Sequence, residues 1–127
     1  MHISQITLTA ALIASAVGGV AYAHPKLLST SPSANTSVAS PSKVQLKFSE
    51  QLIGSMTSAD VMMTGMPGNA HHKPAKMAGF TDAFASDEKT LTLTRPRPLP
   101  TGSYRVLWHA VAVDTHRVAG SFNFAVK

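Results

Sequence analysis

Short segments in which apolar and polar residues alternate most constrain the fold of this 127-residue chain. The alternation is clear at 44–48 and 90–94. Strands are also expected at 103–113, with Tyr104, Val106 and Trp108 on one face, and at 118–126, with Phe122, Phe124 and Val126 on one face; 60–64 is a further candidate strand. Alternation with a period of two places every second side chain on one face of a β-strand. No segment of twelve or more residues has a helical hydrophobic period, and turn-forming residues separate the alternating segments. The sequence therefore predicts an all-β sandwich or barrel.

The beginning of the chain is typical of a cleaved secretory signal peptide. Residues 6–20 are almost entirely apolar or small, and Ala21-Tyr22-Ala23 carries small residues at the two positions that signal peptidase requires. The apolar run is too short and too rich in Ala and Gly for a membrane anchor, which is the alternative. We expect residues 1–23 to be a signal peptide, 24–127 to be one domain, and the protein to be exported to the periplasm.

Composition limits how such a domain is stabilised and what it binds. The chain has no cysteine, so packing alone must stabilise the domain, and a metal site must use nitrogen, oxygen or thioether ligands. The formal net charge is +5, but the basic residues are scattered and do not alternate with aromatic residues. This pattern does not predict nucleic-acid binding.

Cleavage after Ala23 would leave His24 as the first residue, where one residue offers both an α-amine and an imidazole to a metal. Pro25 has no backbone N–H, so a metal cannot bind a deprotonated amide there. Asp114 and His116 are two residues apart, so both side chains can point to one side. Amine, imidazole and carboxylate donors suit Cu(II). Alone, the Asp-x-His pair would be interpreted as a turn with a surface histidine.

A second group of donors is softer. Met63 and Met66 are three residues apart, and His71 and Met77 follow within a segment whose composition predicts a loop. Thioethers favour Cu(I), although methionines also fill gaps in hydrophobic cores. Met62 is interpreted as a core residue.

Several of these segments together resemble the CopC/PcoC periplasmic copper-resistance proteins, over essentially all residues after 23. The resemblance is carried by His24-Pro25-Lys26-Leu27, Phe48-Ser49-Glu50, Met63-Thr64-Gly65-Met66-Pro67-Gly68, Trp108, Asp114-Thr115-His116 and Gly120-Ser121-Phe122. It implies a small Greek-key β-barrel or Ig-like sandwich of about seven strands.

The resemblance also implies two copper sites. His24, Asp114 and His116 would bind Cu(II), and Glu50 would lie at the periphery of that site. Met63, Met66, His71 and Met77 would bind Cu(I). The sequence departs from the family pattern at two places: Asn69 stands where another methionine is expected, and His109 stands where an arginine is expected.

The function implied is that of a monomeric copper carrier or buffer, not an enzyme, which passes copper to an inner-membrane or periplasmic copper-handling protein. One alternative is an oxidative enzyme, because an N-terminal His with a second His resembles the copper brace of lytic polysaccharide monooxygenases. In that case Asp114 would occupy the position that oxygen needs. The other alternative is an Ig-like interaction module that binds no metal, whose thermal stability copper would not change.

Overall fold

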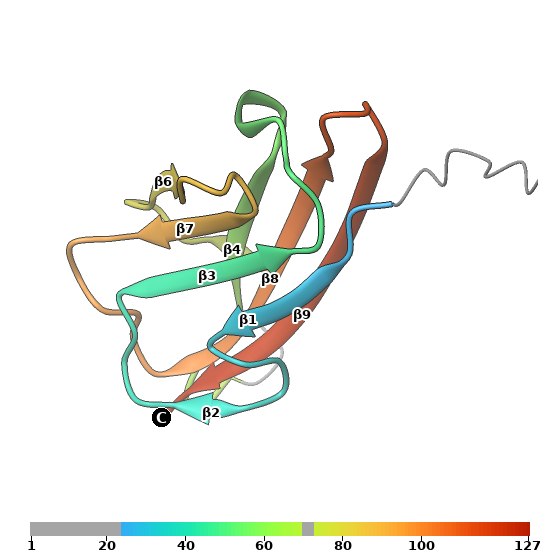
Figure 1. Ribbon diagram of the computed structural model, residues 1–127. Helices are drawn as coiled ribbons and strands as arrows, with labels where there is room; N and C mark the ends of the chain where they lie inside the picture. Colours follow the sequence, from blue (N-terminus) through green and yellow to red (C-terminus); the bar gives the residue numbers. More distant parts are fainter. Residues whose placement is uncertain (1–23, 70–72) are drawn as a thin grey trace, which may run out of the picture.

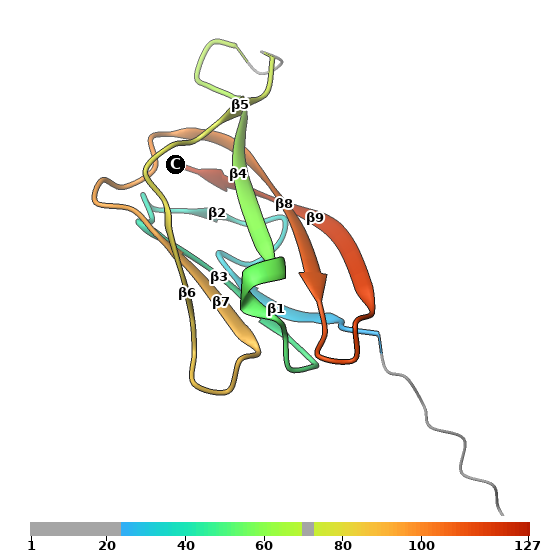
Figure 2. The ribbon, with the colours of Figure 1, turned by 90° about the horizontal axis from the view of Figure 1, so that it is seen from above.

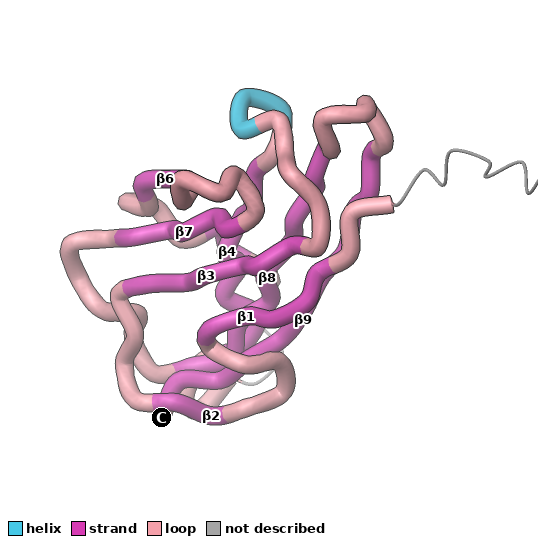
Figure 3. The backbone as a smooth tube through the Cα atoms, viewed as in Figure 1, coloured by secondary structure: helices cyan, strands magenta, loops and turns pink. Residues whose placement is uncertain are grey.

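The computed structural model describes residues 24–69 and 73–127, and over these residues the chain forms two packed β-sheets (Figures 1 and 3). The first sheet has the strand order β1-β3-β7-β6, and the second has the order β2-β9-β8-β4-β5. The first sheet contains β1 (Leu27–Ser31), β3 (Lys43–Phe48), β6 (Thr81–Phe84) and β7 (Thr90–Thr94). The second contains β2 (Ser37–Val38), β4 (Ser58–Gly65), β5 (Ala75–Lys76), β8 (Gly102–Val111) and β9 (Arg117–Val126).

The structure confirms the predicted all-β sandwich. Of the nine strands in the described part of the chain, β2 and β5 have two residues each, and the other seven match the expected number. A single turn of 3-10 helix, η1 (Gly54–Met56), precedes β4. No helix among the described residues is long and apolar enough to cross a membrane. The predicted signal peptide, residues 1–23, lies outside the described residues.

The core lies between the sheets, where the inward faces of the alternating strands meet. β3 buries Val44, Leu46 and Phe48, because its apolar residues occupy every second position. β8 and β9 form a ten-pair antiparallel ladder, and their inward side chains pack on those of the first sheet. The aromatic and large apolar residues of this second layer include Tyr104, Val106, Trp108, Phe122, Phe124 and Val126.

In β4 the structure corrects one expectation from the sequence. Val61 and Met63 are 1% and 8% exposed, whereas Met62 is half-buried on the outer side of the sheet. Met62 was interpreted as the core residue and Met63 as a ligand. The two methionines are adjacent, and the register of β4 against β8 places Met63 opposite the buried Tyr104.

Gly120 has to be glycine because Trp108 lies across it. A Cβ atom at Gly120 would come within 2.5 Å of the Trp108 Cζ2 atom. The Trp108 ring is 8% exposed and packs edge-on against Phe48, with 5.2 Å between ring centroids, so it has little room to move. We expect Gly120→Ala to lower the free energy of unfolding by about 1–3 kcal/mol, the range for overpacking a core. Urea unfolding would measure this, with the exposed Ser121→Ala as the matched control; equal midpoints for the two variants would contradict the prediction.

Candidate metal centre

His24 is the first described residue, and the two residues after it are fixed in the fold. Pro25 is fully buried. Lys26 is bonded to Ser49 twice: its backbone N–H donates to Ser49 Oγ at 2.9 Å, and its carbonyl accepts the Ser49 N–H at 2.8 Å. The backbone that carries the exposed His24 is therefore fixed beside the segment that follows β3.

That same segment is also tied to the β8–β9 loop. Leu52 forms a bridge with Ala112, and the Val113 N–H donates to the Gln51 carbonyl at 3.1 Å. Glu50, which is half-buried, lies between the Ser49 and Gln51 attachments. Three segments distant in sequence thus meet at one end of the sandwich, near the start of the described chain (Figure 1).

The β8–β9 loop, residues 112–116, has a tightly bonded backbone. The Thr115 N–H donates to the Ala112 carbonyl at 2.8 Å, and the Ala112 N–H donates to the His116 carbonyl at 2.9 Å. Thr115 adopts a φ of 75°, a conformation that is uncommon for a β-branched residue. Asp114 and His116, the residues on either side of Thr115, therefore lie at the tip of this turn.

Asp114 and His116 form one hydrogen-bonded unit. Asp114 Oδ1 accepts the His116 backbone N–H at 3.1 Å, and Asp114 Oδ2 lies 2.8 Å from His116 Nδ1. When the ring is neutral, a proton on Nδ1 that is shared with the carboxylate leaves the lone pair on Nε2, the arrangement that metal-binding histidines use.

The hydrogen bond from the His116 side chain, assisted by the His116 backbone N–H, holds the pKa of the Asp114 carboxyl below its ordinary value. The carboxylate therefore stays ionised at neutral and mildly acidic pH. A lowered pKa stabilises the folded loop above the ordinary carboxyl pKa, and this contribution disappears as the pH falls through the lowered value.

The imidazole rings of His24 and His116 lie beside each other. Their centroids are 4.8 Å apart, and the ring planes are inclined by 72°. Among the described residues, no three His, Cys, Asp or Glu side chains are gathered as a ready metal site. In the 127-residue chain the His24 backbone nitrogen is still part of a peptide bond, so its amine exists only after cleavage. His116 thus contacts His24 on one side and Asp114 on the other, and one further ligand depends on processing.

The residues predicted to bind Cu(I) are placed differently. Met63 is buried in the core, and Met77 is half-buried and packs against it. Met66 is 46% exposed, in a turn where Met66 and Asn69 exchange two backbone hydrogen bonds of 2.9 Å. His71 lies outside the described residues. This turn follows β4 at the end of the sandwich opposite to the β8–β9 loop (Figure 2), so the two predicted copper sites are well separated.

The comparisons with known proteins agree with the fold. The family model for the CopC domain matches residues 27–127, a range that includes Asp114 and His116 and begins three residues after His24. The chain belongs to the CopC family.

Two curated relatives and one solved structure illustrate how close this CopC-family chain is to other members. Copper resistance protein C of Escherichia coli is 44% identical over 114 residues, which cover 87% of this chain and 90% of that protein. Copper resistance protein C of Pseudomonas syringae pv. tomato is 41% identical over 111 residues, covering 87% and 86%. The crystal structure of PcoC, a methionine-rich copper resistance protein from Escherichia coli, superposes with a TM-score of 0.74 at 43% identity, covering 83% of this chain and all of that one.

We expect Asp114→Asn to weaken Cu(II) binding at the predicted His24–Asp114–His116 site by at least about 10–100-fold, because that is the cost of removing a partner that orients a metal-binding histidine and Asp114 is also predicted to be a ligand. The amide has one oxygen acceptor instead of two and cannot hold both His116 N–H groups. Competition against a Cu(II) chelator would measure the affinity. Asp87→Asn is the control, because Asp87 accepts a backbone N–H in a similar turn, at 2.9 Å from Lys89, away from the two histidines. Equal affinity in both variants would contradict the role assigned to Asp114.

Proposed function

We propose that this CopC-family protein is a periplasmic copper carrier or buffer that serves copper resistance or homeostasis. In this proposal Cu(II) is bound by the α-amine and imidazole of His24 together with Asp114 and His116. The observation that supports it best is the 4.8 Å approach of the two imidazole rings, which come from opposite ends of the domain sequence. The names of the relatives support copper resistance as the role.

The proposal requires export and cleavage after Ala23. Cleavage turns the His24 peptide nitrogen into an amine, and the oxidising periplasm suits Cu(II). Glu50 lies in the segment joined to both halves of the site, which supports its assignment as a peripheral residue that adds negative charge near the cation.

A second site, for Cu(I), is proposed at the β4–β5 turn. Met66 is exposed there, and His71 follows within the same connection. Met63 and Met77 would have to leave the core to reach a metal at this turn. The carrier would bind copper as a monomer and deliver it to an inner-membrane or periplasmic copper-handling protein.

A Cu(II) titration with electron paramagnetic resonance tests the proposal, using protein whose mass confirms a start at His24. We expect one equivalent to give a tetragonal spectrum with nitrogen coupling, and we expect His24→Ala and His116→Ala each to abolish that spectrum. His109→Ala is the control histidine variant and should retain it. Failure to bind stoichiometric Cu(II) would refute the N-terminal site. Copper-dependent peroxide production with ascorbate would favour the oxidative-enzyme alternative.

A further inference from the structure

A shallow groove on the outer face of the second sheet contains two metal donors that the proposed copper sites do not use. The groove has a volume of about 470 Å³, and its lining includes Met56, His109, Val111, Arg117 and Ala119. Met56 is 39% exposed, and His109 is exposed on the outer side of β8. A thioether and an imidazole therefore face the same solvent-accessible space.

The backbone that carries Met56 is fixed over the end of β8. The Ile53 N–H donates to the Val111 carbonyl at 2.8 Å, and the Val111 N–H donates to Thr57 Oγ1 at 3.1 Å. Both backbone polar groups of Val111 thus bind the residues that flank η1. Because Met56 lies between these two anchors, its backbone is held beside the groove that its residue lines.

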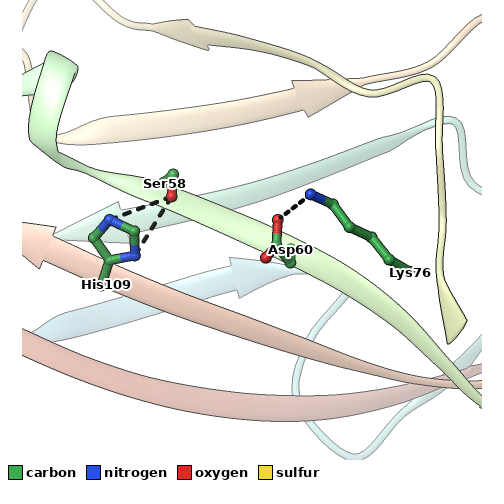
Figure 4. A network of polar contacts seen from close by, with 4 residues as sticks. All are labelled: Ser58, Asp60, Lys76 and His109. Carbon is green, nitrogen blue, oxygen red and sulfur yellow. Dashed lines mark hydrogen bonds and ion pairs between the residues drawn. The ribbon is translucent and has the colours of Figure 1, made fainter. Parts of the chain in front are cut away.

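His109 is held on the other side of the groove. It pairs with Ser58 in the β4–β8 ladder, and Ser58 Oγ lies 3.4 Å and 3.3 Å from the two ring nitrogens (Figure 4). Both contacts are long for a hydroxyl hydrogen bond, so the interaction that orients the ring is weak. A metal would compete easily for one of these nitrogens.

The charges around the groove disfavour a divalent cation more than a monovalent one. The nearest carboxylate along β4, Asp60, is paired with Lys76 Nζ at 3.2 Å (Figure 4) and is not part of the lining. Arg117 shares the groove, and its charge repels a divalent cation twice as strongly as a monovalent one at the same distance. Thioether and imidazole ligands without a carboxylate suit Cu(I).

We propose that Met56 and His109 form a third metal site, which binds Cu(I) or another soft monovalent ion. This proposal rests on the proposed copper-handling function, but it uses residues at neither proposed site. His109 pairs with Ala119, which is three residues from His116. At about 3.3 Å per residue this places the site roughly 10 Å along the strand from the Cu(II) histidine, at the opposite end of the sandwich from Met66.

Ag(I) is a suitable probe, because it is soft, monovalent and stable to air. Protein starting at His24, with 13C-labelled methionine methyl groups, would be titrated with silver nitrate without chloride and followed by NMR. We expect the Met56 methyl and His109 ring resonances to shift together. Met56→Leu and His109→Ala should each remove one equivalent of bound Ag(I), or weaken it at least tenfold. Met66→Leu, which removes the exposed thioether of the β4–β5 turn, should leave the Met56 shift unchanged.

Shifts at Met66 alone, with Met56 and His109 unmoved, would overturn the third site. So would unchanged Ag(I) stoichiometry and affinity in Met56→Leu. The Cu(II) titration of Met56→Leu separates this inference from the proposed function. One equivalent of Cu(II) without a Met56 response to Ag(I) refutes only the third site. A Met56 response without Cu(II) binding refutes only the N-terminal site.

Discussion

Adding one residue in front of His24 is expected to weaken Cu(II) binding more than the removal of any group that only orients a ligand. The extension converts the α-amine into a peptide nitrogen, which is a poor ligand at neutral pH. The backbone offers no replacement, because Pro25 has no N–H and the Lys26 N–H already donates to Ser49 Oγ. Removing a group that only orients a ligand costs about 10–100-fold, so loss of a ligand should exceed that range.

The extension should leave the fold intact. Pro25 is buried, and the Lys26–Ser49 hydrogen bonds lie on the domain side of His24, so an added residue projects away from the core. The control is one alanine added after Lys127, which should change neither thermal stability nor Cu(II) affinity. If the N-terminally extended protein bound Cu(II) as tightly as the protein starting at His24, the α-amine would not be a ligand.

The strands with strict alternation were predictable from the sequence alone. Thr90–Thr94 forms β7 with the predicted bounds, and the predicted faces of β8 and β9 are buried as expected. Residues 24–43 are rich in Ser, Pro, Ala and Asn, a composition that indicates turns and edges rather than defined strands, but they contain β1 and β2. Each of these is the edge strand of a sheet, and their Ser-rich sequences bury too little to leave an alternating pattern.

The residues of the candidate Cu(II) site could be predicted from the sequence, but the contacts that bring their segments together could not. His24 and the Asp114–His116 pair have a recognisable chemistry, and the resemblance to a family connected them. The sequence contains no signal that Ser49 would hold Lys26 or that Gln51 would hold Val113, because these hydrogen bonds join backbone groups of one segment to a distant segment. The groove with Met56 and His109 was hidden for the same reason: the two residues line one groove where Ile53 and Thr57, on either side of η1, are bonded to Val111.

The second large effect is expected at Met63, where the core role suggested by the structure and the ligand role suggested by the sequence lead to opposite results. Met63 is 8% exposed, and its Cε methyl lies 2.8 Å from where a Cβ on Gly102 would be, so it fills the space over that glycine. Truncating such a residue costs about 2–5 kcal/mol. We therefore expect Met63→Ala to lower the free energy of unfolding by that amount, as measured by urea denaturation.

Two neighbouring methionines provide matched controls for this prediction. Met66→Ala should stay within about 0.5 kcal/mol of the unchanged protein, as is usual for exposed positions, and the half-buried Met62 should fall between the two. Burying a methionine side chain stabilises a fold by about 1.5–3 kcal/mol, and Cu(I) would have to overcome this to recruit Met63. Cu(I) affinity should consequently depend more on Met66 than on Met63. A negligible loss of stability in Met63→Ala, together with a large loss of Cu(I) affinity, would instead place its sulfur at the metal.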